Sequence, residues 1–271
     1  MPENAPASLR ILIKGNSLVT AMSEWNQTRE HWTFPRVLEE TLADRGHRVE
    51  VVNRSRAGGI ASQFFENWET DVHVWRPDVI ISTMGEYECM HGILPRWLER
   101  HAHNLNKRPG PVRNLYRKYV IGKFWQACAK VQQRIDRVLR DRLFARKAER
   151  VGGQLEEFVR RSSKVGKPLV LQFELLPPGP RGDGWFPGMA SRLLLMNASF
   201  QSVVTRLGDD DVRIFPTSRY ADAVDAPDGN PVPDGFHYIP ALHELIGRAL
   251  ADEIEAWAAT PTALAATDAA S

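Results

Sequence analysis

The stretch Ile11-Leu-Ile-Lys-Gly-Asn-Ser-Leu18 joins an apolar run to a turn in which glycine, asparagine and serine follow one another. Aliphatic and β-branched runs that end at turn residues are typical of buried strands. Two interpretations of Ser17 fit this stretch. A serine after a strand can cap the next helix by accepting a hydrogen bond from a backbone N–H. A serine in the same place can also be a nucleophile at the edge of a sheet.

The rest of the chain repeats this pattern of short apolar runs separated by stretches with helical spacing. The predicted strands are 10–14, 48–52, 78–82, 168–173 and 212–215. Strands that alternate with helices favour right-handed crossovers and a parallel sheet covered on both faces. Ligands bind such sheets at the carboxyl ends of the strands. Ser17 follows one of those ends, which favours a functional role.

Composition limits the class of protein. The chain has 271 residues, of which 43% are hydrophobic and 25% charged, enough for one large core. It has neither an apolar run of about 18 residues nor a signal-peptide pattern, so we expect a cytoplasmic protein without a membrane span. We expect no cofactor, because no nucleotide-binding glycine loop occurs, and no metal, because His101 and His103 are flanked by basic residues without a convergent carboxylate. Cys89 and Cys128 fit structural or incidental roles.

Basic residues are concentrated in one segment. Arg96 to Arg150 contain sixteen Lys and Arg against four Asp and Glu, net +12, which leaves 19 basic and 29 acidic residues elsewhere, net −10. The segment 95–150 interrupts the strand–helix rhythm and predicts an inserted helical lid, with Trp125, Cys128, Val131, Ile135, Val138, Leu139 and Leu143 on one face of a helix.

Three interpretations of this basic segment remain. It is a solvated lid, a docking surface for an acidic acyl carrier protein or a coenzyme A-type acyl donor, or, less favoured, a surface for nucleic acid or an anionic membrane. The tail 258–271 has no apolar period, and we expect it to be disordered.

A serine nucleophile needs a base that takes its proton and donors that stabilise the oxyanion. Near the other end of the chain, Asp234 and His237 stand three residues apart in "VPDGFHYIP". This spacing lets both side chains face one side of a turn, so that the carboxylate can orient the imidazole. The pattern by itself is unspecific, because it recurs by chance.

Four blocks together are more specific than any one of them. "GNSL" follows the first strand, "NRSRAGG" the second, "PDVIISTMGEYE" ends the third, and "DGFH" lies near the C-terminus. In this order the sequence resembles the SGNH/GDSL hydrolase family over residues 9–257, with 95–150 as an insertion. The resemblance implies a three-layer α/β/α sandwich with a five-stranded parallel sheet and a serine-based acyl-transfer mechanism.

The resemblance also implies site residues. Ser17 would be the nucleophile, His237 the general base and Asp234 the partner that orients it. The backbone N–H groups of Ser17 and Gly58 would form the oxyanion hole, with Gly59 as a one-residue alternative. A glycine suits this role, because it lets the backbone approach the substrate closely.

The third block departs from the family pattern Gly-x-Asn-Asp. Here Gly85-Glu86-Tyr87-Glu88 places Tyr87 where the oxyanion-hole asparagine belongs. Loss of one such donor typically costs about 2.7–4 kcal/mol of transition-state stabilisation. Glu86 and Glu88 could contact a cationic or hydroxyl-bearing substrate or be bonded within the loop. Gly59, Gly85 and Trp185 are further candidate contacts from their positions, and Asn16 stands where the family usually has Asp.

The leading hypothesis is a serine esterase that forms an acyl-Ser17 intermediate on a specialised small-molecule or carrier-bound acyl substrate. The second is an acyltransferase of the same fold, in which an alcohol or amine replaces water. The third is a binding protein that keeps the fold with weakened catalysis. The sequence does not decide between hydrolysis and transfer.

Overall fold

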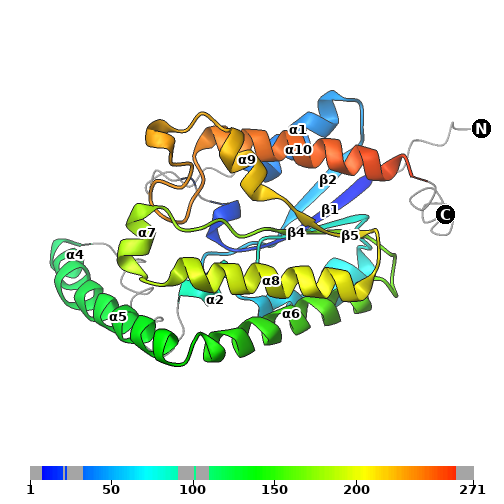
Figure 1. Cartoon of the computed structure of the whole chain (residues 1–271). Coiled ribbons are helices and arrows are strands. Elements are labelled where there is room, and N and C mark those ends of the chain that lie inside the picture. The colour runs from blue at the N-terminus through cyan, green and yellow to red at the C-terminus, as the bar shows by residue number, and fades with distance from the viewer. Residues whose placement is uncertain (1–7, 21, 23–32, 91–100, 102–109, 261–271) are drawn as a thin grey trace, which may run out of the picture.

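Five parallel strands form one sheet in the order β2-β1-β3-β4-β5 (Figure 1). The structure is a computed structural model that describes residues 8–20, 22, 33–90, 101 and 110–260. The strands are β1 Leu9–Lys14, β2 Val49–Asn53, β3 Val79–Ser82, β4 Leu169–Phe173 and β5 Val212–Phe215. Each predicted strand agrees with the observed one to within one residue at either end, so the parallel five-stranded sheet is confirmed.

Helices cover both faces of the sheet. Alternate strand residues point to opposite faces: Ile11 and Ile13 pack in one core with α1 Phe34–Asp44 and α10 Pro240–Ala258. Leu12 packs in the other core, with α6 Arg142–Ser162 and α8 Met189–Leu207. The result is the predicted three-layer α/β/α sandwich, which Figure 1 shows nearly edge-on.

Local sequence explains where these helices begin, end and meet. Proline occupies the first turn of α1 and of α10, where its missing N–H costs no hydrogen bond. Gly208 ends α8 in the left-handed conformation at φ +58°. A Cβ on Gly152 would lie 2.4 Å from Ser199 Oγ, so this glycine lets α6 and α8 pack closely.

Short helices fill the connections. They are Ser17–Val19, Ala61–Phe65, Glu69–Val74, α2 Glu86–Met90, α7 Pro180–Trp185, α9 Thr217–Ala223 and Pro227–Gly229. Within the described residues, no helix has the length and apolar character needed to cross a membrane.

A helical arm projects from the body beside α7 (Figure 1). We call residues 111–138 the arm: α4 Pro111–Tyr116, the helical turn Arg117–Ile121 and α5 Gly122–Val138. The arm is anchored by a buried ion pair in which Arg192 Nη1 of α8 donates to Asp136 Oδ2 at 2.9 Å.

The arm confirms a helix but corrects the predicted buried face. Val131, Val138, Leu139 and Leu143 are exposed, while Ala129, Gln132 and Asp136 are buried. Polar residues lie inward because Arg192 supplies a buried partner that the hydrophobic pattern does not register.

The predicted bounds of the insertion and of the tail agree with the structure only in part. The expected insertion boundary at residue 150 falls inside α6, whose Phe144 and Ala148 already belong to the core beneath the sheet. Residues 91–100, 102–109 and 261–271 lie outside the described residues, and with them much of the N-terminal part of the insertion and most of the tail.

Candidate active site

The turn after β1 presents Ser17 at the carboxyl edge of the sheet. Gly15 is required there, because a Cβ would lie 2.2 Å from Thr83 Oγ1. The helical turn Ser17–Val19 is capped by Asn16, whose Oδ1 accepts a hydrogen bond from the Leu18 N–H at 2.9 Å. The interpretation of Ser17 as the cap is therefore wrong, and its hydroxyl is available for another partner.

That partner is His237. The Ser17 Oγ to His237 Nε2 distance is 3.0 Å, and the His237 Nδ1 to Asp234 Oδ2 distance is 2.7 Å. The structure thus brings together three residues that are separated by up to 220 positions. The His237–Asp234 pair is largely shielded from bulk water, since the His237 side chain is 9% exposed and the Asp234 side chain is 11% exposed.

The Asp234 carboxylate is held by its own turn. Its Oδ1 accepts hydrogen bonds from the backbone N–H groups of Phe236 at 2.8 Å and His237 at 2.7 Å. An ionised carboxylate can only accept, so His237 Nδ1–H donates to Oδ2. This leaves Nε2 as the acceptor that faces the Ser17 hydroxyl, which is the tautomer a general base requires.

Two backbone donors point to an oxyanion hole beside Ser17. Within the described part of the chain, neither the Ser17 N–H nor the Gly58 N–H donates a backbone hydrogen bond. The Gly59 N–H, the one-residue alternative, donates to Arg56 O at 3.0 Å. Gly58 adopts φ +70°, a conformation that glycine tolerates best. These observations favour Gly58 over Gly59 as the second donor.

Tyr87 lies against Gly58. A Cβ built on Gly58 would meet the Tyr87 ring at 3.4 Å and its hydroxyl oxygen at 3.7 Å. The half-buried phenol therefore occupies the neighbourhood in which the resemblance places an asparagine. A side chain at position 58 would be strained by the positive φ, while its Cβ would make ordinary van der Waals contact with Tyr87.

Glu86 is directed inward, to the turn that carries Ser17. Its Oε2 accepts a hydrogen bond from Asn16 Nδ2 at 2.9 Å, and Asn16 Nδ2 also donates to Thr83 O at 3.3 Å. Burial raises the pKa of Glu86 to about 7, against the smaller opposing effects of His237 and the Asn16 hydrogen bond. Asn16 thus joins Glu86 to the turn that carries Ser17.

Glu88 and Gly85, two further candidate contacts, have partners within the protein. Glu88 Oε1 accepts from the Ala61 N–H at 2.5 Å, and burial raises the pKa of Glu88. Substrate contact by Glu86 and Glu88 is therefore not supported, because both are 7% exposed and bonded internally. Gly85, at φ +112°, is where a Cβ would meet the Phe200 ring at 2.8 Å, which is a packing constraint.

The contact of Trp185 with substrate stays a prediction. Trp185 is 43% exposed on α7. Its neighbour Phe186 meets Phe236, the residue before His237, with ring centroids 5.3 Å apart.

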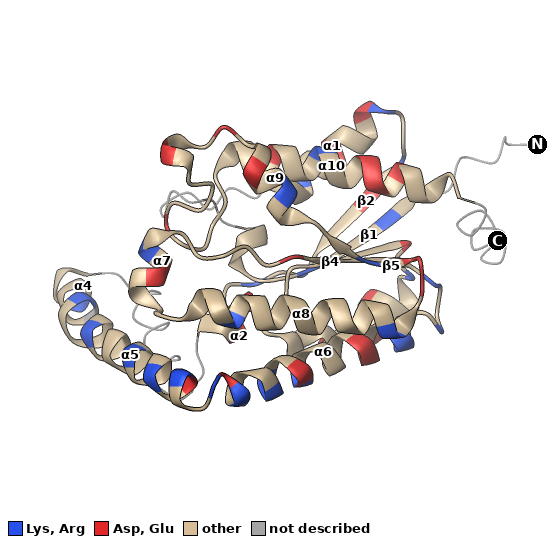
Figure 2. Cartoon of the chain, viewed as in Figure 1, with Lys and Arg blue, Asp and Glu red and all other residues tan. Residues whose placement is uncertain are grey.

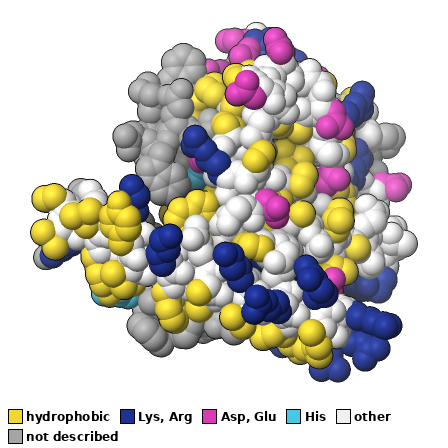
Figure 3. Space-filling view, turned by 60° about the vertical axis from the view of Figure 1, so that its left-hand side comes forward, with side chains coloured by type: hydrophobic (Ala, Val, Ile, Leu, Met, Phe, Trp, Pro, Cys, Tyr) yellow, Lys and Arg dark blue, Asp and Glu magenta, His cyan; other side chains and the backbone are white. Residues whose placement is uncertain are grey.

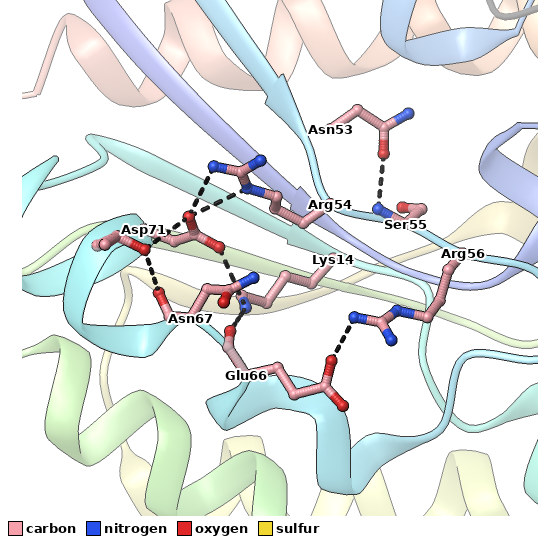
Figure 4. A network of polar contacts seen from close by, with 9 residues as sticks. Lys14, Asn53, Arg54, Ser55, Arg56, Glu66, Asn67 and Asp71 are labelled. Atoms are coloured by element: carbon pink, nitrogen blue, oxygen red, sulfur yellow. Dashed lines mark hydrogen bonds and ion pairs between the residues drawn. The ribbon is translucent and has the colours of Figure 1, made fainter.

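A polar network joins the end of β1 to the segment after β2 and to residues 66–71 (Figure 4). Lys14, the last residue of β1, is 2% exposed and donates from Nζ to Glu66 O at 2.8 Å. Asp71 lies 3.7 Å from the same ammonium and accepts from Arg54 Nε at 3.0 Å. Arg56 pairs with the Glu66 side chain. Burial lowers the pKa of Lys14.

This network was missed by sequence reasoning. It fixes the run 54–56 that leads to Gly58, so it positions one candidate oxyanion donor. The available signal was a lysine that ends an apolar strand, since a buried ammonium requires nearby acceptors.

Comparisons with known proteins define the class of fold. No protein-family model matches the chain, and no curated protein matches its sequence. Solved structures do match over nearly the whole chain, and they include an aryl esterase, a lipase/acylhydrolase and a putative GDSL-like lipase. The chain therefore has the α/β/α fold of the SGNH/GDSL hydrolases.

Three of these structures illustrate the similarity. A lipase/acylhydrolase from Enterococcus faecalis has a TM-score of 0.56 and 14% identity over 91% of this chain and 95% of its own. The native aryl esterase of M. smegmatis has a TM-score of 0.54 and 17% identity over 92% and 99%. A putative GDSL-like lipase from Parabacteroides merdae has 0.54 and 15% over 89% and 92%.

Proposed function

We propose that this chain is a serine ester hydrolase of the SGNH/GDSL type, with Ser17 as nucleophile, His237 as general base and Asp234 as the residue that orients His237. The observation that carries the proposal is the 3.0 Å contact between Ser17 Oγ and His237 Nε2, backed by the 2.7 Å contact to Asp234. The fold, the hydrogen bonds of Ser17, His237 and Asp234, and the two backbone N–H groups that donate to no backbone acceptor among the described residues all support the same chemistry.

The proposed reaction has two steps. Ser17 Oγ attacks the ester carbonyl carbon while His237 Nε2 takes the hydroxyl proton, and the oxyanion accepts hydrogen bonds from the N–H groups of Ser17 and Gly58. The carbon–oxygen bond to the alcohol then breaks, and His237 returns the proton to that alcohol. In the second step water attacks the acyl-Ser17 carbonyl, again with His237 as base, and releases the acid.

Active-site labelling tests the nucleophile. A fluorophosphonate should add once to the parent protein, at Ser17 by peptide mapping. The adduct should be absent in Ser17→Ala and formed at least about a hundredfold more slowly in His237→Ala, because the base is lost. An exposed serine outside the site, Ser202→Ala, is the matched control and should label like the parent. A folded parent protein that forms no adduct would overturn the proposal and favour a binding protein.

Product analysis separates hydrolysis from acyl transfer. With an activated ester as substrate, we expect free acid as the product, and the same product when alcohols or amines are added at high concentration. An acylated alcohol or amine formed at the expense of the acid would instead identify an acyltransferase that uses the same acyl-Ser17 intermediate.

A further inference from the structure

The arm exposes apolar side chains along its length. On α5, Phe124, Val131 and Val138 are 51%, 49% and 78% exposed, and their spacing of seven residues places them on one side of the helix. The same exposure continues toward α4. Before α5, the exposed apolar residues of the arm are Val112, Leu115, Tyr116, Tyr119 and Val120. Leu139 and Leu143, which follow the C-terminal end of α5, are exposed as well.

Basic side chains form a second stripe beside the apolar one. The exposed basic residues of α5 recur at helical spacing: Lys123, Lys130, Arg134 and Arg137. Three of them directly precede Phe124, Val131 and Val138, and Arg134 follows Val131 by three residues. Figure 3 shows hydrophobic and Lys or Arg side chains next to one another on the projecting arm, and Figure 2 shows the basic residues along α5.

The arm carries almost no compensating acid. Residues 110–140 contain eight Lys and Arg and a single acid, Asp136. Asp136 is buried on the opposite side, where it pairs with Arg192. The outward face therefore combines apolar area with positive charge. A second copy of the chain bound arm to arm would bring the two basic stripes together, which is unfavourable.

We propose that the arm docks on an anionic lipid surface, with Phe124, Val131 and Val138 inserted among the lipids and the basic stripe at the headgroups. A helix of this kind lies in the interface plane, because its apolar side enters the acyl boundary while Lys and Arg attract anionic headgroups. Tyrosines on the same arm fit this boundary, since their rings are apolar and their hydroxyls polar.

A lipid surface fits the arm better than an acidic carrier protein does. The exposed apolar residues extend along a projecting element, from Val112 to Val138. A bilayer accepts a protruding apolar stripe of any length. The arm also lies on the same side of the molecule as the carboxyl end of β1, so docking would bring the Ser17 edge toward the lipid (Figure 1).

Vesicle co-sedimentation tests the proposal with the full-length Ser17→Ala protein, so that lipid turnover cannot affect binding. We expect binding to mixed phosphatidylcholine–phosphatidylglycerol vesicles, weak binding to pure phosphatidylcholine vesicles, and loss of binding as salt is raised. Replacing Phe124, Val131 and Val138 by serine should weaken binding at least about tenfold. Replacing Lys123, Lys130 and Arg134 by glutamine should weaken it about fivefold per charge.

Matched substitutions outside the arm serve as controls. Leu194→Ser removes an apolar side chain that is 71% exposed on α8, and Lys164→Gln removes an exposed charge; both should bind as the parent does. Circular dichroism melting verifies that each variant is folded. Absence of binding to the mixed vesicles, or binding that the serine substitutions leave unchanged, would overturn lipid insertion. Binding of an acidic acyl carrier protein without vesicle binding would assign the arm to a protein partner.

Discussion

At the scale of single residues, the hydrogen bond between Asn16 and Glu86 distinguishes the turn that carries Ser17. The side-chain amide of Asn16 accepts from Leu18 N–H and donates to Glu86, so one residue shapes the turn and satisfies a buried carboxyl group. An aspartate at position 16, which the family resemblance would favour, could not donate to Glu86. The two residues are complementary as a pair.

Asn16→Asp should therefore be harmful in this chain. It would place two carboxyl groups about 2.9 Å apart in a buried site, and we expect lower unfolding free energy and a lower kcat/KM toward an activated ester. The double variant Asn16→Asp with Glu86→Gln should recover most of both, with a coupling free energy of about 1–3 kcal/mol in a double-mutant cycle. Additive effects of the two changes would contradict direct pairing.

Glu86 should also make stability depend on pH. Burial raises its pKa from 4.5 to about 7, so between these values the folded state binds more protons than the unfolded state, and stability falls as pH rises. Glu86→Gln removes this penalty. We expect the variant's advantage in unfolding free energy to grow from pH 4.5 to pH 7 and then level off, at no more than about 3 kcal/mol.

Urea unfolding at a series of pH values measures this difference. Glu50→Gln, at an exposed carboxyl on β2, is the matched control and should show no such trend. A difference between Glu86→Gln and the parent that does not change with pH would contradict the assignment.

Tyr87 tests how many donors the oxyanion hole has. If its hydroxyl takes the role of the family asparagine, Tyr87→Phe should lower kcat by about 10²–10³ with little change in KM, because the lost donor acts in the transition state. The phenol lies next to Gly58, and we expect this loss. Tyr220→Phe, at a tyrosine of α9 away from Ser17, is the control. An unchanged kcat would mean that only the two backbone N–H groups, of Ser17 and Gly58, act as oxyanion-hole donors.

At the scale of elements, a buried ion pair holds the arm to the body. Arg192 is 1% exposed, and it donates from Nη1 to Asp136 of α5 and from Nε to Cys89 O of α2 at 2.7 Å. One side chain of α8 therefore connects three helices.

Asp136→Ala should destabilise the protein by about 3–5 kcal/mol, because the Arg192 charge would stay buried without its partner. We also expect faster limited proteolysis within the arm. Glu149→Ala, an exposed acid on α6, should change neither urea unfolding nor proteolysis. Unchanged stability in Asp136→Ala would show that the ion pair does not anchor the arm.

At the scale of the whole molecule, the reaction rates of the two cysteine thiols distinguish local exposure from global unfolding. Cys89 is fully buried, and burial raises the pKa of its thiol well above the ordinary value, whereas Cys128 lies partly exposed on α5. An aromatic disulfide reagent should react quickly with one thiol of the native protein and with the second at the rate of global unfolding. Cys128→Ser should abolish the fast phase. Two fast thiols would contradict a closed core around α2.

Much of the architecture follows from the sequence. The apolar runs at the five strands and the helical spacing between them predict a parallel sheet with covered faces, because a strand buried on both sides must be apolar throughout. The motif order predicts that Ser17, Gly58 and the Asp234–His237 pair lie at the carboxyl edge of the sheet. The strands, helices and turns can be predicted because the residues that determine each of them lie within a few positions of one another.

Tertiary structure alone decided the rest, because the deciding partners are distant in sequence. Whether Glu86 faces substrate or Asn16 depends on a contact between residues 70 positions apart. The inward face of α5 is set by Arg192, 56 positions from Asp136, against the hydrophobic pattern of the helix. A buried charge overrides periodicity when a partner reaches it, since an unpaired charge in the interior costs more than a few exposed apolar side chains.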